Sequence, residues 1–422
     1  MADYLSMSKE ALQAEQQILQ KNYDAYCAKG LKLDMSRGKP CPQQLDLSMD
    51  LLKIQQTTAE NGMDLRNYGC LEGIPEARHL FAELLGTSEE LTMVGGNSSL
   101  NLMFEVIGIG CRDGFGGTPW DKDEHKKFLC PSPGYDRHFR VTEYYGFELV
   151  PVKMTPDGPD MDAVEELVKD GSVKGIWCVP TYSNPDGYCY SDETVRRLAA
   201  LQPAAENFKI MWDNAYVVHY LGDAPAETLN IMQECKKTGR EEMPVLFCSS
   251  SKITFPGAGV AALSAGPETF KVLLKGMFPM TIGFDKLNQL RHVLFLKDKQ
   301  HILAHMAKHK AVIGPKFDAM QHLLTQGLAG CGEIASWTHP QGGYFISLYA
   351  MPGCAKRTVA LCKQAGVVLT GAGAAYPYGK DPQDSNIRLA PTYPALAEVE
   401  EATKLICVAL RLATVEALLA KI

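Results

Sequence analysis

One lysine in this chain ends an apolar run and enters a loop of small residues. The apolar run 244–248 is followed by three serines, then by Lys252, and then by a loop that contains Gly257 and Gly259. This pattern predicts a buried strand that delivers one amine to a polar pocket. Loss of hydration favours the neutral, nucleophilic form of such an amine, which can form a Schiff base with a carbonyl group. The alternative is a solvated lysine beside a turn.

A second group of residues suits an anion. Gly96, Asn97 and Ser98 follow the apolar segment 91–94 and open a helical pattern. Glycine lets a ligand approach the backbone, and the free N–H groups at a helix N-terminus attract phosphate. A plain turn with a Ser or Asn cap explains the same residues equally well.

Polar and aromatic side chains also follow other apolar runs. Tyr135 follows the run 127–130, where a tyrosine can stack on a flat ring or simply pack in the core. Asn184 can donate to a ligand oxygen, although Asn-Pro is also a turn former. Asp213 ends another run, and a carboxylate buried there needs a cationic partner such as a protonated ring nitrogen. Tyr216, three positions later, can reach the same ligand.

The elements that must position these residues are short apolar runs that alternate with helical patterns. Because the runs lack polar alternation, we expect strands covered on both faces, in a mainly parallel sheet of an α/β fold. Ligands of such sheets bind beyond the carboxyl ends of the strands. The predicted strands are 127–130, 147–152, 174–179, 208–212, 244–248 and 260–264.

Further elements flank this region. Apolar spacing predicts an N-terminal amphipathic helix, one long helix that could link two domains, and a smaller α+β region with two apolar segments and a final helix. In chain order these are 6–30, 286–311, 344–349, 386–390 and 396–420.

The five strand ends together provide phosphate donors, an aromatic platform, an amide, an acid and an amine. Pyridoxal 5′-phosphate needs this set of partners. The order and spacing of the motifs resemble the class I pyridoxal-phosphate-dependent aminotransferases of fold type I. The chain is most similar to the subgroup of aspartate aminotransferases related to the catalytic domain of MocR-type proteins.

This resemblance covers nearly the whole chain and implies its organisation. It implies a large, mainly parallel-sheet domain at 51–310 that binds the cofactor, and a smaller α+β domain at 311–422. An N-terminal segment, 1–50, would pack with the small domain.

The resemblance also implies a role for each motif. Lys252 would carry the Schiff base, Asp213 would pair with the pyridinium nitrogen, and Tyr216 would help to bond the phenolic oxygen of the ring. Arg388 would grip the substrate α-carboxylate with its planar guanidinium group. The implied cofactor contacts are Tyr68, Gly96, Asn97, Ser98, Tyr135, Asn184, Asp213, Tyr216, Ser249 and Lys252. The implied substrate contacts are Gly38, Asn184 and Arg388.

Two positions concern the phosphate. Tyr68 resembles a tyrosine that reaches the phosphate of the neighbouring subunit, which implies a homodimer with shared active sites. Val260 stands where many relatives carry an arginine that pairs with the phosphate. The phosphate charge would then be neutralised by N–H groups, hydroxyls or another cation.

The predicted function is transfer of an amino group between an amino acid, such as aspartate or glutamate, and a 2-oxo acid by a ping-pong mechanism. Arg37 is a candidate for the distal carboxylate, with a solvated loop arginine as the alternative. Another reaction on the same cofactor, such as a β-lyase or decarboxylase reaction, stays open because the fold does not decide it. A ligand-sensing domain of a MocR-type regulator is a further alternative.

Composition narrows the class and location. The net charge is −7 without a basic stripe, which argues against nucleic acid, and no apolar stretch is long enough for a membrane span. Thirteen scattered cysteines without a C-x-x-C pair, and the lack of a signal-peptide pattern, favour the cytoplasm. His301, His305 and His309 share a helical face, for which we favour a solvated or interfacial surface over a metal site.

Overall fold

The computed structural model describes residues 3–422 and is built around an eight-stranded sheet. The strand order is β2-β9-β8-β7-β6-β3-β4-β5, in which the contacts from β8 through β4 are parallel. β9 is antiparallel to both of its neighbours, and β5 is antiparallel to β4. The strands are β2 (Thr92–Val94), β3 (Lys127–Ser132), β4 (Glu148–Thr155), β5 (Gly158–Pro159), β6 (Val173–Cys178), β7 (Lys209–Asp213), β8 (Pro244–Ser249) and β9 (Ala261–Ala265).

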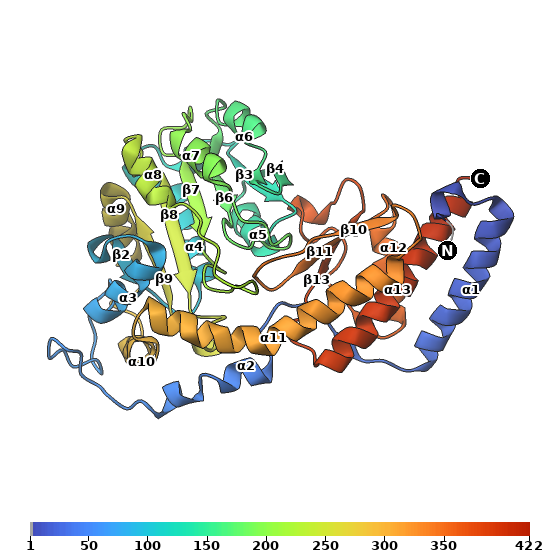
Figure 1. Ribbon diagram of the computed structural model, residues 1–422. Coiled ribbons are helices and arrows are strands. Elements are labelled where there is room, and N and C mark those ends of the chain that lie inside the picture. The colour runs from blue at the N-terminus through green and yellow to red at the C-terminus, as the bar shows by residue number, and fades with distance from the viewer. Residues whose placement is uncertain (1–2) are drawn as a thin grey trace.

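Helices cover both faces of this sheet (Figure 1). Met211 packs with α4, α5 and α9, whereas its neighbours Ile210 and Trp212 pack with the helices of the other face. Both faces are buried, which explains why the strands read as continuous apolar runs. The helices are α3 (Pro75–Leu85), α4 (Ser99–Asp113), α5 (Asp136–Tyr144), α6 (Met161–Leu167), α7 (Asp192–Ala200), α8 (Ile231–Lys237), α9 (Pro267–Met277) and α10 (Lys286–Leu296). The mainly parallel α/β fold expected from the sequence is confirmed.

A second, smaller sheet has the antiparallel order β10-β11-β13 and packs against long helices (Figure 1). The N-terminal helix α1 lies beside α13, and their apolar residues share one core with β11 and β13. A two-stranded parallel pair, β1 and β12, joins the N-terminal segment to this region. The remaining elements are α1 (Lys9–Ala28), β1 (Leu33–Asp34), α2 (Pro42–Asp46), α11 (Lys299–Leu328), β10 (Ala335–Trp337), β11 (Ile346–Ala350), α12 (Ala355–Gln364), β12 (Val367–Val368), β13 (Asn386–Leu389) and α13 (Leu396–Leu419).

The single long helix predicted at 286–311 is wrong, because the chain breaks it into α10 and α11. Lys297 has a positive φ of 61°, and the Asp298 side chain then accepts from the His301 N–H as the N-cap of α11. The apolar spacing continues through the break, so periodicity alone did not reveal it. α11 extends well past residue 311 and runs from the α10 side to the small sheet (Figure 1).

Within residues 3–422 no helix is long and apolar enough to cross a membrane. The same part of the chain contains no group of three or more His, Cys, Asp or Glu residues that could hold a metal ion.

Candidate active site

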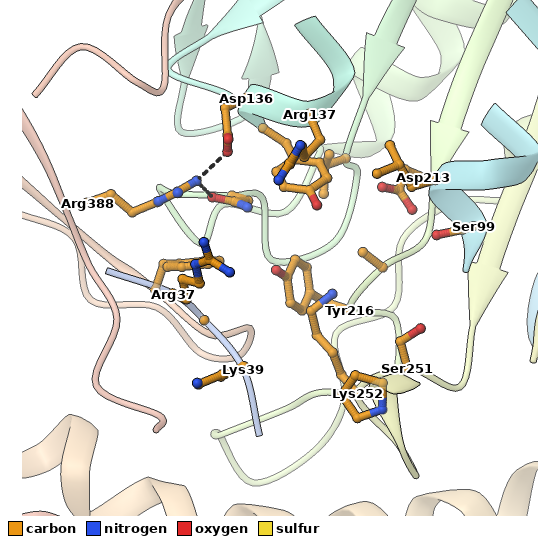
Figure 2. A pocket seen from close by; sticks show the side chains of 18 of the residues that line it. Arg37, Lys39, Ser99, Asp136, Arg137, Asp213, Tyr216, Ser251, Lys252 and Arg388 are labelled. Carbon is orange, nitrogen blue, oxygen red and sulfur yellow. Dashed lines mark hydrogen bonds and ion pairs between the residues drawn. The ribbon is translucent and has the colours of Figure 1, made fainter. Parts of the chain in front are cut away.

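A cavity of about 640 Å³ lies between the carboxyl ends of the large-sheet strands and the small sheet (Figure 2). It brings together residues that are far apart in the sequence. The predicted site residues that line it are Gly38, Ser98, Tyr135, Asn184, Asp213, Tyr216, Ser249, Lys252 and Arg388. Gly96, Asn97 and Tyr68 do not belong to its lining.

Lys252 enters the cavity three residues after the end of β8. Its Nζ atom lies 4.7 Å from the centre of the Tyr216 ring. Burial lowers the pKa of the Lys252 amine below its ordinary value, and the negative charge of Asp213 partly offsets this effect. A hydrogen bond fixes the loop that carries Lys252: the Ser250 hydroxyl accepts from the Val260 N–H at 2.9 Å. The arrangement provides an amine that reaches its nucleophilic form more readily than a solvated lysine.

Asp213 is the last residue of β7 and is almost completely buried. Its Oδ2 atom lies 3.0 Å from Nε2 of His138, whose ring stacks on Trp177 at 4.3 Å. The other carboxylate oxygen, Oδ1, is buried without a hydrogen-bond partner among residues 3–422. A buried acceptor of this kind calls for a donor, and a protonated ring nitrogen in the cavity would supply one.

The N-terminus of α4 opens on the same cavity. Ser98 is its N-cap and accepts from the Leu100 N–H, and Ser99 begins the helix. Ser249, the last residue of β8, and Ser251, two residues later, also line the cavity, with their hydroxyl oxygens 3.2 Å apart. Hydroxyls and the positive end of a helix suit a phosphate group.

Gly96 and Asn97 lie next to this group of serines but do not line the cavity. The Asn97 carbonyl accepts from the Ser251 hydroxyl at 3.3 Å, and the Gly96 carbonyl accepts from the Ala261 N–H. Both residues shape the loop before α4 with their backbone. Val260 is buried and does not belong to the lining of the cavity. Its apolar side chain therefore provides no charge for a phosphate.

Tyr135 and Asn184 extend the site on the side of the small sheet. Tyr135 is the residue before α5, and burial raises the pKa of its hydroxyl to about 12. Burial also raises the pKa of Tyr216 well above its ordinary value. Both phenols therefore stay protonated at neutral pH and can donate hydrogen bonds.

Arg388 reaches the cavity from β13 (Figure 2). Its Nη1 atom lies 3.1 Å from Asp136 and 3.3 Å from the Asn184 side-chain oxygen. Its Nε atom is buried without a partner in the described part of the chain. Gly38 belongs to the same wall, because a Cβ atom there would clash with the ring of Phe345, over which the Arg388 guanidinium lies at 5.0 Å. The wall can accept a carboxylate in a bidentate manner.

Several lining residues were not singled out from the sequence. Asp136, Arg137, Ser99 and Ser251 line the cavity, and His138 supports Asp213 from behind. The segment 135–138 is polar and directly follows a predicted strand, so extending the strand-end rule by three residues would have found it.

Tyr68 lies outside the cavity and is 85% exposed. Two backbone carbonyls beside it, those of Asn67 and Gly69, accept from the Lys286 ammonium group at 2.6 and 3.0 Å. These bonds anchor the loop to α10 while the Tyr68 side chain stays exposed.

The histidines of α11 do not form the solvated or interfacial face predicted for them. His305 and His309 are buried and lie 3.1 Å apart through their Nε2 atoms, whereas His301 is exposed and pairs with Asp298. Gln44 and Ser48 bond to the buried pair. The two buried histidines therefore join the N-terminal segment to α11 in a polar cluster. This cluster contacts the loop that carries Lys252, because His305 Nε2 lies 2.9 Å from the Ile253 carbonyl.

Comparison with known proteins adds to this geometry. Residues 7–421 match the family model described as aspartate amino-transferase. The chain is 44% identical to an aspartate aminotransferase from Corynebacterium glutamicum over 94% of this chain and 93% of that protein. A crystal structure of an aspartate transaminase from Corynebacterium glutamicum superposes with a TM-score of 0.96, at 42% identity and 99% coverage of both chains.

A more distant structure shares the fold. It is an α-aminoadipate aminotransferase from Thermus thermophilus, complexed with N-(5′-phosphopyridoxyl)-L-leucine. The TM-score is 0.74 at 21% identity, over 94% of this chain and 95% of that one.

Proposed function

This chain belongs to the aspartate aminotransferase family, and we propose that the cavity around Lys252 transfers amino groups from a dicarboxylic amino acid. The protein is a pyridoxal-phosphate-dependent aminotransferase of fold type I. One observation carries the proposed site: Lys252, Arg388 and Asp213, whose Oδ1 atom is buried without a partner among residues 3–422, all line one cavity.

Pyridoxal 5′-phosphate, when bound, supplies an aldehyde for amine chemistry and a ring that accepts electrons. The residues present fit this cofactor. The serines at α4 and β8 would hold the phosphate, Tyr135 would support the ring, and Asp213 Oδ1 would accept from the ring N–H. Tyr216 and Asn184 would bond the phenolic oxygen.

In the absence of substrate, Lys252 would hold the cofactor through its Nζ atom. Its released Nζ atom would then take a proton from the substrate α-carbon, as a general base. The lowered pKa of the amine supports this role, because the neutral form must be accessible near neutral pH. Asp213 would keep the ring nitrogen protonated throughout, and the same steps would run in reverse with a 2-oxo acid, which predicts ping-pong kinetics.

Arg388 would bind the substrate α-carboxylate. Its present partner Asp136 is about one third exposed, so a carboxylate with better geometry can replace it. The backbone at Gly38 would lie beside that carboxylate, since no larger residue fits against Phe345.

A dicarboxylic substrate needs a second cation. Arg37 and Arg137 both line the cavity (Figure 2), and within residues 3–422 neither side chain makes a hydrogen bond or ion pair. The name of the Corynebacterium glutamicum relative supports aspartate as the amino donor. We propose that one of these two arginines binds the distal carboxylate.

We also propose a homodimer in which Tyr68 reaches the phosphate site of the partner. Beside its loop lies a cluster of exposed apolar side chains on the segment after α9, namely Phe278, Met280 and Ile282. The two segments contact each other, because a Cβ atom on Gly283 would clash with the Gly69 carbonyl. Adjacent exposed apolar residues favour self-association. A cytoplasmic location is proposed from the thirteen free cysteines.

The test is a coupled assay of the purified holoprotein with aspartate and 2-oxoglutarate. We expect glutamate and oxaloacetate in equal amounts, and loss of turnover in a Lys252→Ala variant. If pyruvate or free ammonia formed instead, the activity would be that of a lyase and the proposal of transamination would be wrong. Normal activity in the Lys252→Ala variant would refute the site.

A further inference from the structure

Asp186 is a buried acid close to the site that the proposed chemistry does not use. It is 2% exposed, and its Oδ1 atom accepts from the Tyr349 hydroxyl at 2.6 Å. Tyr349 belongs to β11 of the small sheet, whereas Asp186 belongs to the loop after β6 of the large sheet. The bond therefore joins the two sheets beside the cavity.

The strand register connects Tyr349 with the carboxylate-binding arginine. In the antiparallel pair of β11 and β13, Tyr349 lies opposite Asn386 and Ser347 lies opposite Arg388. Directly opposed residues point to the same face of a sheet, as do residues two apart on one strand. The face that carries Arg388 therefore also carries Tyr349, and Asn386 donates to the Ser347 hydroxyl at 2.7 Å on it.

The loop on the other side of the bond is closed by its own backbone hydrogen bonds. The N–H of Gly187 donates to the Ser183 carbonyl at 2.6 Å, and the N–H of Ser183 donates to the Tyr188 carbonyl at 2.8 Å. Gly187 has a φ of +73°, and a Cβ atom there would clash with Pro340. Asn184 lies in this hydrogen-bonded turn, two residues before Asp186.

We infer that Asp186 and Tyr349 are positioning residues that fix the distance between Asn184 and Arg388 and so set the affinity for the substrate carboxylate. The inference rests on the proposed function, in which Arg388 binds the substrate α-carboxylate and Asn184, its hydrogen-bond partner, contacts the cofactor. Asn184, in the loop after β6, and Arg388, in β13, meet at 3.3 Å. The bond of Asp186 to Tyr349 joins the same loop to the neighbouring strand β11.

Energetics support a positioning role over a merely stabilising one. Burial raises the pKa of Asp186 to about 6, against the lowering effect of the Tyr349 and Ser347 hydroxyls. An acid with a raised pKa is destabilising in its ionised form. A neutral residue would fill the same space at lower cost, so the carboxylate is better explained by geometry that the site needs.

Two variants and one control test this. Tyr349→Phe removes only the hydroxyl, and Asp186→Asn removes only the charge. Tyr188→Phe is the control: Tyr188 lies in the same loop, and its hydroxyl has no hydrogen-bond partner in the described chain. Each holoprotein would be assayed with aspartate and 2-oxoglutarate, and maleate binding would be measured by calorimetry.

Both test variants weaken a hydrogen bond to a charged group. We therefore expect KM for aspartate and Kd for maleate to rise about tenfold in each of them. The kcat of both test variants should stay within about twofold of the unsubstituted protein, as should every value for Tyr188→Phe. In an Arg388→Lys background, Tyr349→Phe should have almost no further effect.

The outcomes separate the two proposals. KM and Kd within twofold of the starting values in both variants would overturn the positioning role, as would a fall in kcat with unchanged KM. If the unsubstituted protein transfers no amino group, the proposed function fails. Maleate binding would then still decide whether Asp186 and Tyr349 organise a carboxylate site.

Discussion

His138 and Asp213 are joined by a hydrogen bond of 3.0 Å although they come from different elements, α5 and β7. Both side chains are nearly inaccessible to solvent. The His138 ring stacks flat on Trp177, so its Nε2 atom has a fixed direction toward the carboxylate. Oδ2 is thereby satisfied, whereas Oδ1 has no partner among residues 3–422 and is the acceptor that we propose for the ring nitrogen.

Replacing His138 by Phe should lower kcat by tenfold or more. The aromatic ring would still stack on Trp177, but Asp213 Oδ2 would lose its partner, and an unsatisfied buried charged group costs about 1–3 kcal/mol or more. His138→Gln should recover part of the loss by restoring a donor. The pH dependence of cofactor absorbance would report the effect, and an unchanged spectrum and kcat in His138→Phe would contradict the role.

Asp136→Asn should lower KM for the amino acid substrate by about threefold. Asp136 competes with the substrate for Arg388, and a partly exposed ion pair of this kind contributes up to about 1 kcal/mol. Steady-state kinetics with aspartate would measure it. A higher KM would mean instead that Asp136 orients Arg388 for binding.

Substitution of Arg37 and Arg137 by Met, singly and together, should identify the distal-carboxylate site. The variant that loses this contact should show kcat/KM for aspartate reduced about 10- to 100-fold, with activity toward alanine unchanged. The measurement is the ratio of kcat/KM for aspartate to kcat/KM for alanine in each variant. Equal losses for aspartate and alanine in the double variant would exclude both residues from side-chain recognition.

The difference in melting temperature between the unsubstituted protein and Asp186→Asn should depend on pH, because Asp186 loses its proton as the pH rises. Its folded pKa of about 6 exceeds the roughly 3.9 of an unfolded chain, so the folded protein binds this proton more tightly. That stabilisation is complete below about pH 4 and is lost as the pH rises through 6, a change of about 3 kcal/mol or less. Asp186→Asn should therefore gain in Tm relative to the unsubstituted protein between pH 4.5 and 7.5. A constant Tm difference would contradict the raised pKa.

The central strands β3, β6, β7 and β8 of the large sheet were predictable from sequence because both of their faces are buried. The two-residue edge strand β5 was not predicted. The middle of each central strand is apolar, although β3, β6 and β7 carry a lysine near the start, and polar residues follow at the carboxyl end. Asp213 follows the buried residues of β7, and Lys252 follows three serines at the end of β8. Since these ends meet at one edge of a parallel sheet, their order along the chain already predicted one site, and both residues line one cavity.

The division between α10 and α11 was not predictable in this way. Apolar periodicity reports which face of a helix is buried, and that face continues across Lys297. The break depends on one backbone angle and on the cap at Asp298, which are local features within a continuous pattern.

The sequence by itself determined the residue types at the strand ends, and with them the cofactor chemistry. Only the tertiary structure decided which side chains support them: His138 behind Asp213, Asp136 on Arg388, and Tyr349 on Asp186. These contacts join residues 75, 252 and 163 positions apart. Periodicity and strand ends are local properties of the chain, whereas a hydrogen bond between two elements exists only once their packing has fixed both partners.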